Sequence, residues 1–182
     1  MSGTEIRKAA PGDSRVIAEL HTRSFRNAYA HLPLTARSAE SGLEGRVEFW
    51  EDRLLGGGGR TLVAEDGDKV VGFVHFGLSP DDDAEEKTGH IFSVHVDPDL
   101  TGKGVGRKLV DAAVSALSDE GYRAVTLWAI ADNARARRFY SGLGWRTDGA
   151  ARIEKLAVGG EEGDLVEVVR FFLDVAGVSE RA

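Results

Sequence analysis

The feature that most constrains the fold is residues 94–107, where a β-strand pattern passes through a sharp turn into the start of a glycine-rich helix. Helix N-termini leave backbone N–H groups unpaired and carry the positive end of the helix dipole. The three glycines of this segment let an anion approach the backbone without meeting a Cβ atom, and Lys103 and Arg107 add positive charge. The segment therefore predicts a phosphate-binding site that suits a pyrophosphate.

A strand-to-helix corner without a ligand is the alternative interpretation of this segment, because such turns also serve only to reverse the chain. Two nucleotide-binding motifs are excluded by spacing. A P-loop requires Gly-Lys-Ser/Thr, but Lys103 is followed by Gly104. A dinucleotide fold requires Gly-x-Gly-x-x-Gly, whereas the spacing here is Gly-x-Gly-x-Gly.

Strand and helix patterns interleave along the rest of the chain, which predicts one α/β or α+β domain over residues 1–182. An acidic run at 81–86 is expected to be an exposed loop, and a further loop is expected around His31–Leu34. The expected strands lie at 4–8, 60–65, 69–76, 89–96, 124–130, 145–156 and 165–175, and the expected helices at 14–25, just before 56–59, at 104–121 and at 133–143.

Composition narrows the class of protein. The 182 residues are 42% hydrophobic, which is enough for a packed core, and they contain no cysteine, so disulfides and a cysteine nucleophile are excluded. The net charge of −7 argues against nucleic acid as a partner. No signal peptide or membrane span is found, so a soluble, cytoplasmic protein is expected, with a homodimer left open. His21 and His31 have no ligand partners at metal-binding spacing, so no metal is predicted.

The glycine-rich segment resembles the acetyl-CoA motif of the GNAT superfamily, Gln/Arg-x-x-Gly-x-Gly/Ala, with Gly104 and Gly106 at its glycine positions. Thr101 departs from the motif by replacing Gln or Arg, which leaves the backbone donors available. Residues 133–145 are similar to a second family pattern, Asn-x-x-Ala-x-x-Phe-Tyr-x-x-x-Gly-Phe, with Trp145 in the last position. Their order and separation also match the family.

The resemblance implies a mixed, mostly antiparallel sheet of six to seven strands flanked by helices, with acetyl-CoA as cosubstrate. In this family the strand before the glycine loop splays from its neighbour, and pantetheine lies in the opening. The backbone of Val94 and Val96 would meet the pantetheine amides, and the N–H of Val94 would face the thioester carbonyl. The implied cofactor-binding residues are Val94, His95, Val96, Thr101, Gly102, Lys103, Gly104, Val105, Gly106, Arg107, Asn133 and Tyr140.

Two residues are expected to carry proton transfer. By resemblance Tyr140 lies near the CoA sulfur and acts as general acid, although a tyrosine in this position could also only pack beside Phe139. His90 is the leading candidate for the base that accepts the amine proton, with His95 and a water chain as alternatives. Strand alternation puts His90 and His95 on opposite faces unless a bulge intervenes.

The resemblance implies direct transfer of an acetyl group to a primary amine of a small molecule or a protein. A CoA-binding sensor without turnover is the alternative, followed by a structural domain without a ligand. The acceptor is open: Phe25, Tyr29, Trp50 and Trp128 could line its pocket or belong to the core. Glu40, Glu44, Glu48 and Glu51 could favour a cationic amine or form a solvated helix face.

Overall fold

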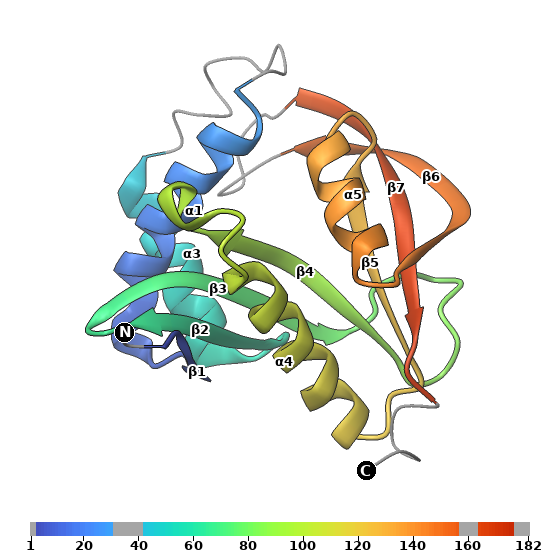
Figure 1. Cartoon of the computed structure of the whole chain (residues 1–182), viewed down its shortest axis with the longest axis horizontal. Helices are drawn as coiled ribbons and strands as arrows, with labels where there is room; N and C mark the ends of the chain where they lie inside the picture. Colours follow the sequence, from blue (N-terminus) through green and yellow to red (C-terminus); the bar gives the residue numbers. More distant parts are fainter. Residues whose placement is uncertain (1–2, 31–41, 157–163, 177–182) are drawn as a thin grey trace.

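The computed structural model describes residues 3–30, 42–156 and 164–176, and Figure 1 labels its elements. The loop expected around His31–Leu34 lies outside the described residues. The elements are β1 (Glu5–Lys8), the 3-10 helix η1 (Pro11–Asp13), α1 (Ser14–Ala28), α3 (Leu43–Gly56), β2 (Arg60–Asp66), β3 (Lys69–Leu78), β4 (Thr88–Val96), the 3-10 helix η2 (Pro98–Leu100), α4 (Val105–Asp119), β5 (Ala124–Ile130), α5 (Ala134–Gly142), β6 (Arg146–Leu156) and β7 (Asp164–Asp174).

The described strands form one seven-stranded sheet in the order β1-β2-β3-β4-β5-β7-β6. Every neighbouring pair is antiparallel except β4 and β5, which are parallel. The mixed, mostly antiparallel sheet that the sequence predicted is therefore confirmed. The α4 helix forms the crossover that a parallel pair of strands requires.

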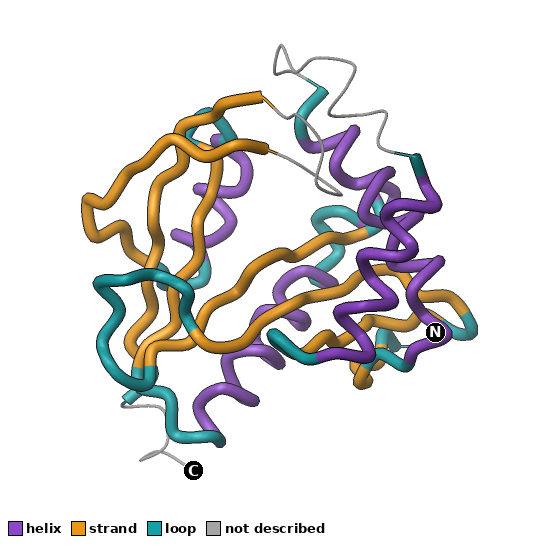
Figure 2. The backbone as a smooth tube through the Cα atoms, turned by 180° about the vertical axis from the view of Figure 1, so that it is seen from behind, coloured by secondary structure: helices purple, strands orange, loops and turns teal. Residues whose placement is uncertain are grey.

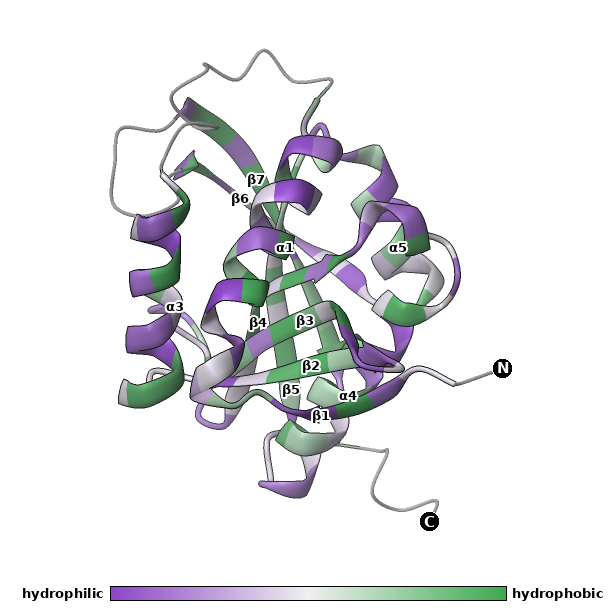
Figure 3. Cartoon of the chain, turned by 90° about the vertical axis from the view of Figure 1, so that its left-hand side faces the viewer, coloured by the Kyte–Doolittle hydropathy of each residue, from purple (hydrophilic) through white to green (hydrophobic). Residues whose placement is uncertain are grey.

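Helices cover both faces of the sheet. On one face α4 packs through apolar residues at helical spacing, among them Val105, Leu109, Ala113 and Leu117, and α5 lies beside it (Figure 1). The other face is covered by α1 and α3 (Figure 2). These helices pack on a second core that includes Trp50. Since β3 is covered on both faces, its interior residues are almost continuously buried, and hydrophobic residues gather on the central strands (Figure 3).

The acidic run is only partly the exposed loop that the sequence predicted. Asp82, Asp83, Glu85 and Glu86 are exposed, but the side chain of Asp81 retains only 2% of its accessible surface. The expectation is therefore wrong for Asp81. Its carboxylate accepts hydrogen bonds from side chains of three different strands, and these contacts compensate for the cost of burying its charge.

A β-bulge in β4 changes which histidines share a face. His75 pairs with Ser93 and Phe76 with Ile91, so Phe92 is the extra residue in β4. His90 pairs with Gly77 and His95 with Phe73, and these two partners are four residues apart in β3. Because residues an even number apart in a strand point to the same face, His90 and His95 share a face. The sequence placed them on opposite faces unless a bulge intervened, and the bulge at Phe92 does intervene.

Candidate active site

An opening separates β4 from β5. The two strands pair only from Thr88 to His90, and beyond that point they diverge. The N–H of Asp97 donates to the carbonyl oxygen of Val71 in β3, at 2.8 Å. Backbone polar groups alternate sides along a strand, so those of Val94 and Val96 point away from β3 and into the opening. Two residues of β4 therefore offer backbone donors and acceptors to a ligand there.

A cavity of about 1090 Å³ joins this opening to the space beneath α1 and α3. Its wall includes residues from α1, α3, β3, β4, β5, α5, β6 and the glycine-rich loop, so sequence-distant segments meet around it. The four aromatic residues whose role was open in the sequence all line it: Phe25, Tyr29, Trp50 and Trp128. Phe25 and Trp50 are also buried core residues, so packing and cavity lining coincide in them.

The glycine-rich loop lies at the N-terminal end of α4. Gly102 and Gly104 have φ angles of 79° and 87°, a left-handed conformation that favours glycine, and an added Cβ at either position would meet no atom within 4 Å. Open space therefore adjoins the backbone at Gly102 and Gly104. At Gly106 an added Cβ would lie 3.4 Å from the Phe139 ring, so α5 packs against the start of α4 at this residue.

Most of the cofactor-binding residues inferred from the sequence lie together at the cavity wall. Two do not: Lys103 is exposed outside it, and Val105 is a core residue with 4% of its surface accessible. The residues brought together are Val94, His95, Val96, Thr101, Gly102, Gly104, Gly106, Arg107, Asn133 and Tyr140.

Asn133 links α5 to α1. Its Oδ1 accepts a hydrogen bond from the backbone N–H of Ala136 at 3.0 Å, which caps the N-terminus of α5. Its side chain also hydrogen-bonds to the hydroxyl of Tyr29. Burial raises the pKa of Tyr29 above its usual range, so that hydroxyl stays protonated.

Tyr140 is half-buried at the cavity wall, with its ring 5.9 Å from the rings of both Trp145 and Phe171. Burial raises the pKa of Tyr140 well above its usual range, and the nearby Tyr29 reinforces the shift. A neutral phenol at physiological pH can donate a proton or a hydrogen bond but cannot act as a base. The arrangement therefore suits the general acid that the sequence predicted.

Three histidines line the cavity on the α1 and α3 side: His21, His75 and His95. Burial lowers the pKa of all three, to about 4 for His75 and His95 and well below the usual value for His21. Each imidazole is therefore neutral at physiological pH.

These histidines differ in which of their ring nitrogens have contacts. Trp50 donates to Nδ1 of His21 at 3.3 Å, and Arg53 lies 3.4 Å from Nε2 of His75. His95 contacts the Ser24 hydroxyl through Nδ1 at 2.6 Å, whereas its Nε2 has no hydrogen-bond partner among the described residues. Nε2 of His21 likewise has no hydrogen-bond partner among the described residues, so His21 and His95 each offer an available ring nitrogen, and His95 is the one that lies in β4 next to Val94.

His90 lies outside the cavity wall, with 4% of its surface accessible. Its Nδ1 is 2.8 Å from the hydroxyl of Thr126, and its ring packs against that of Phe92. Burial lowers the pKa of His90 to about 4, a shift that the carboxylate of Asp81 opposes. The role of His90 as catalytic base remains a prediction from the sequence.

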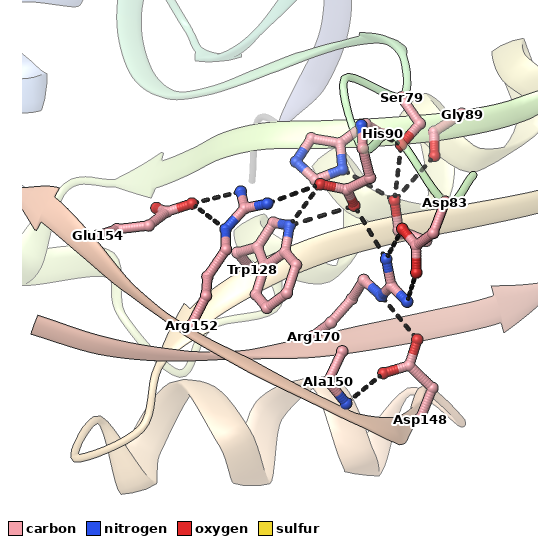
Figure 4. Close-up of polar contacts among 12 residues, drawn as sticks. Ser79, Asp83, Gly89, His90, Trp128, Asp148, Ala150, Arg152, Glu154 and Arg170 are labelled. Carbon is pink, nitrogen blue, oxygen red and sulfur yellow. Dashed lines mark hydrogen bonds and ion pairs between the residues drawn. The ribbon is translucent and has the colours of Figure 1, made fainter.

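Asp81 organises a buried ionic cluster near His90. Figure 4 labels its partners Trp128, Arg152 and Arg170. Its carboxylate accepts hydrogen bonds from Nε1 of Trp128 at 3.0 Å and from Nη1 of Arg152 at 3.0 Å, and it lies 3.4 Å from Nη1 of Arg170. The guanidinium of Arg152 stacks 4.0 Å above the Trp128 ring. The cluster therefore fixes the position of an aromatic residue at the cavity wall.

Sequence reasoning missed Asp81, Ser24 and Arg53 as contributors to the site. Asp81 was hidden in a run of acids, and its arginine partners follow it by 71 and 89 residues. Ser24 and Arg53 occupy the inward faces of α1 and α3, where the only available signals were their helical spacing relative to Leu20 and Trp50, respectively.

No described helix is long and apolar enough to cross a membrane. Within residues 3–30, 42–156 and 164–176, His, Asp and Glu side chains form no group of three that could hold a metal ion.

The fold is shared with solved acetyltransferases. An N-acetyltransferase from Staphylococcus aureus Mu50 superposes with a TM-score of 0.69 at 22% identity, covering 95% of this chain and 99% of that one. The protein yncA from Salmonella typhimurium, solved with its cofactor acetyl-CoA, superposes with a TM-score of 0.68 at 25% identity, covering 96% and 95%. The architecture is that of the N-acetyltransferases.

The chain belongs to the Acetyltransferase (GNAT) family, whose model matches residues 16–145. It is 34% identical over 136 residues to a mycothiol acetyltransferase of Kocuria rhizophila, covering 72% of this chain and 43% of the relative. It is 31% identical over 150 residues to a mycothiol acetyltransferase of Actinosynnema mirum, covering 80% and 46%. The chain thus spans less than half the length of these curated relatives.

Proposed function

We propose that this protein is an N-acetyltransferase that moves the acetyl group of acetyl-CoA to a primary amine of a small molecule. One observation carries the proposal: the opening between β4 and β5, the glycine loop and Tyr140 all border a single cavity. The family match supports acetyl transfer, and the names of the curated relatives support it further without specifying the acceptor. Because acetyl-CoA is a cytoplasmic metabolite, we place the reaction in the cytoplasm.

The residues at the cavity fit acetyl-CoA. Gly102 and Gly104 leave open space at the N-terminus of α4, and Arg107 and Arg135 lie at the same wall, which suits a pyrophosphate. The backbone groups of Val94 and Val96 suit the pantetheine amides, as an added strand would. When bound, acetyl-CoA supplies an acyl carbonyl activated by a thiolate leaving group.

Three groups of the chain would act on the reacting atoms. The N–H of Val94 would donate a hydrogen bond to the carbonyl oxygen as negative charge develops there. His95 would accept a proton from the amine as the N–C bond forms, and Tyr140 would give its proton to the sulfur as the C–S bond breaks. A weak base suffices for the first transfer, because nitrogen becomes far more acidic once it bonds to the carbonyl carbon.

The shape of the acceptor end supports a small molecule. Helices α1 and α3 cover this end, and aromatic side chains line it, among them Phe25, Tyr29 and Trp50. An aromatic-lined pocket with a few polar groups is typical of a small-ligand site.

A thermal melt with and without acetyl-CoA, followed by thiol release against a panel of amines, tests the proposal. Acetyl-CoA at about 100 times its dissociation constant should add ~2.7 kcal/mol of stability and raise the melting temperature. Stabilisation with amine-dependent thiol release supports the transferase. Stabilisation without release from any amine would favour a CoA-binding sensor, and no stabilisation would overturn the cofactor assignment.

A further inference from the structure

The two faces of α3 carry charges of opposite sign. Arg46, Trp50 and Arg53 follow one another at helical spacing, and all three point inward. The outward face is acidic and exposed, which confirms the solvated-face interpretation for Glu44, Glu48 and Glu51, while Glu40 lies outside the described residues. Glu44, Glu48 and Glu51 therefore face away from the cavity, and Arg46 and Arg53 face towards it.

Arg53 is a half-buried cation at the cavity wall. Its guanidinium lies 4.3 Å above the Phe49 ring, and its Nη1 is 3.4 Å from Nε2 of His75. An arginine can only donate, so that contact uses the lone pair of a neutral imidazole and does not balance the charge. No carboxylate among the described residues pairs with Arg53, and burial lowers its pKa. A cation in this environment is stabilised by an anion.

Arg46 lies two turns earlier on the same face, with 1% of its surface accessible. Its Nη1 donates to the hydroxyl of Thr22 at 2.5 Å, but its Nε and Nη2 have no hydrogen-bond partner among the described residues. Its charge lowers the pKa of His21 and His95, both of which line the cavity, beyond the larger effect of their burial. Arg46 is therefore a second cation without a carboxylate partner among the described residues. It lies behind the cavity wall and makes this end of the cavity electropositive.

The acids at the cavity wall do not cancel this charge. Glu154 is already ion-paired with Arg152, and Asp132 belongs to the turn between β5 and α5. His75, the neighbour of Arg53, is opposite Ser93 in the strand register, which is the residue before Val94. Arg53 therefore lies on the same part of the cavity wall as Val94, with one side-chain contact and one strand pairing between them.

We propose that the acceptor is a small amino acid, whose carboxylate is held by Arg53 while its amine faces His95 and Val94. This inference rests on the proposed acetyltransferase function and specifies its substrate class. The guanidinium of Arg53 matches a carboxylate through parallel N–H donors, and Arg46 strengthens the attraction from behind. Because the histidines of the cavity wall are neutral, none of them places a positive charge beside the amine.

The experiment compares α-, β- and γ-amino acids with their carboxamides as acceptors, using thiol release to measure kcat/KM. The wild-type protein should favour an acid over its amide by roughly 10- to 100-fold, the range expected for a charge-assisted hydrogen bond. The amine of an amino acid amide is less basic than that of the acid, so a larger fraction of it is unprotonated at the assay pH. The supply of free amine therefore favours the amide, and a preference for the acid has to come from recognition of the carboxylate. Equal rates, or faster rates with the amides, would overturn the inference.

Substitutions of Arg53 test whether this residue causes the preference for acids over amides. Arg53→Gln should reduce the acid-to-amide ratio towards one, mainly by raising KM for the acid, and Arg53→Lys should restore part of it. Arg15→Gln is the matched control, because it removes one cation from the exposed side of the neighbouring α1, where Arg15 pairs with Glu44. The control should keep the wild-type ratio. An unchanged ratio in Arg53→Gln would overturn the assignment of Arg53.

The two proposals fail in different ways. Absence of stabilisation by acetyl-CoA, or absence of thiol release with every amine, would remove the proposed function. Robust thiol release with amines that carry no carboxylate, together with no preference for the acids, would leave the acetyltransferase standing and remove the amino acid as its substrate. The wild-type comparison decides this even if an Arg53 variant fails to fold.

Discussion

Tyr140 combines access to the cavity with a hydroxyl that burial keeps protonated. Tyr140→Phe keeps the packing of the ring and removes the proton, so kcat should fall roughly 10-fold or more while affinity for CoA is unchanged. Steady-state thiol release and titration calorimetry measure the two quantities. Tyr122→Phe is the control, since Tyr122 packs on the core away from the cavity. A wild-type rate for Tyr140→Phe would reduce this tyrosine to a packing role.

His95 and His90 provide a matched pair for the assignment of the base, because they share a face of the sheet, but His90 is buried outside the cavity whereas His95 is half-buried and lines it. His95→Gln should lower kcat at least ~10-fold, and His90→Gln should have the smaller effect. A base acts unprotonated and the pKa of His95 is about 4, so kcat should show no acid limb near pH 6.5 and should decline only towards pH 4. A larger loss in His90→Gln would return the role to His90.

At the scale of elements, the glycine loop depends on backbone conformation as much as on space. Gly104→Val forces a β-branched residue into a φ angle of 87° and puts a side chain where the phosphates are proposed to lie, so it should abolish binding of CoA. Gly121→Val is the control, since Gly121 has a φ angle of 85° just beyond the other end of α4. Calorimetry measures both. An equal loss of affinity in the two variants would indicate backbone strain alone.

The loop between β3 and β4 is attached to β5, β6 and β7 through Asp81. Asp81→Asn leaves two arginines facing a neutral group in a buried position, which should lower the free energy of unfolding by about 3 kcal/mol. Asp83→Asn, which removes a carboxylate that is 65% exposed and also pairs with Arg170, should cost clearly less than Asp81→Asn. Urea unfolding followed by tryptophan fluorescence measures both, and equal costs would contradict a special role for Asp81.

For the molecule as a whole, the buried histidines couple folding to pH. His21, His75, His90 and His95 all have pKa values below the unfolded value of 6.5, to about 4 in the last three. The unfolded chain therefore binds more protons below pH 6.5, so stability is complete above that pH and falls as the pH drops towards 4. Each histidine adds up to about 1.4 kcal/mol per pH unit to this slope.

Urea unfolding at a series of pH values from 7 to 4.5 measures this dependence. His90→Gln removes one of the four titrating groups without altering the cavity wall, so its slope should be shallower than that of the wild type. A free energy of unfolding that does not change between pH 6.5 and 5 would show that the histidines are not titrated by unfolding.

The sequence by itself determined the features that depend on neighbouring residues. The periodicity of α4, the Asp-Gly turn between β2 and β3, and the glycine corner at 102–106 are set by local propensity and by the φ angles that glycine permits, so their place in the chain could be predicted. The family motifs then indicated a sheet of mixed direction, because a resemblance carries long-range information that a pattern of residues does not.

Tertiary structure alone decided which side chains meet. The bulge at Phe92 moved His95 to the face of His90, and no local signal marks that residue as extra. Asp81 became a buried ion only because Arg152 and Arg170 arrive from strands formed much later in the chain, and Arg53 became a cavity residue only because α3 packs over β3. Burial, pairing and pKa depend on these distant contacts, and a linear pattern does not encode them.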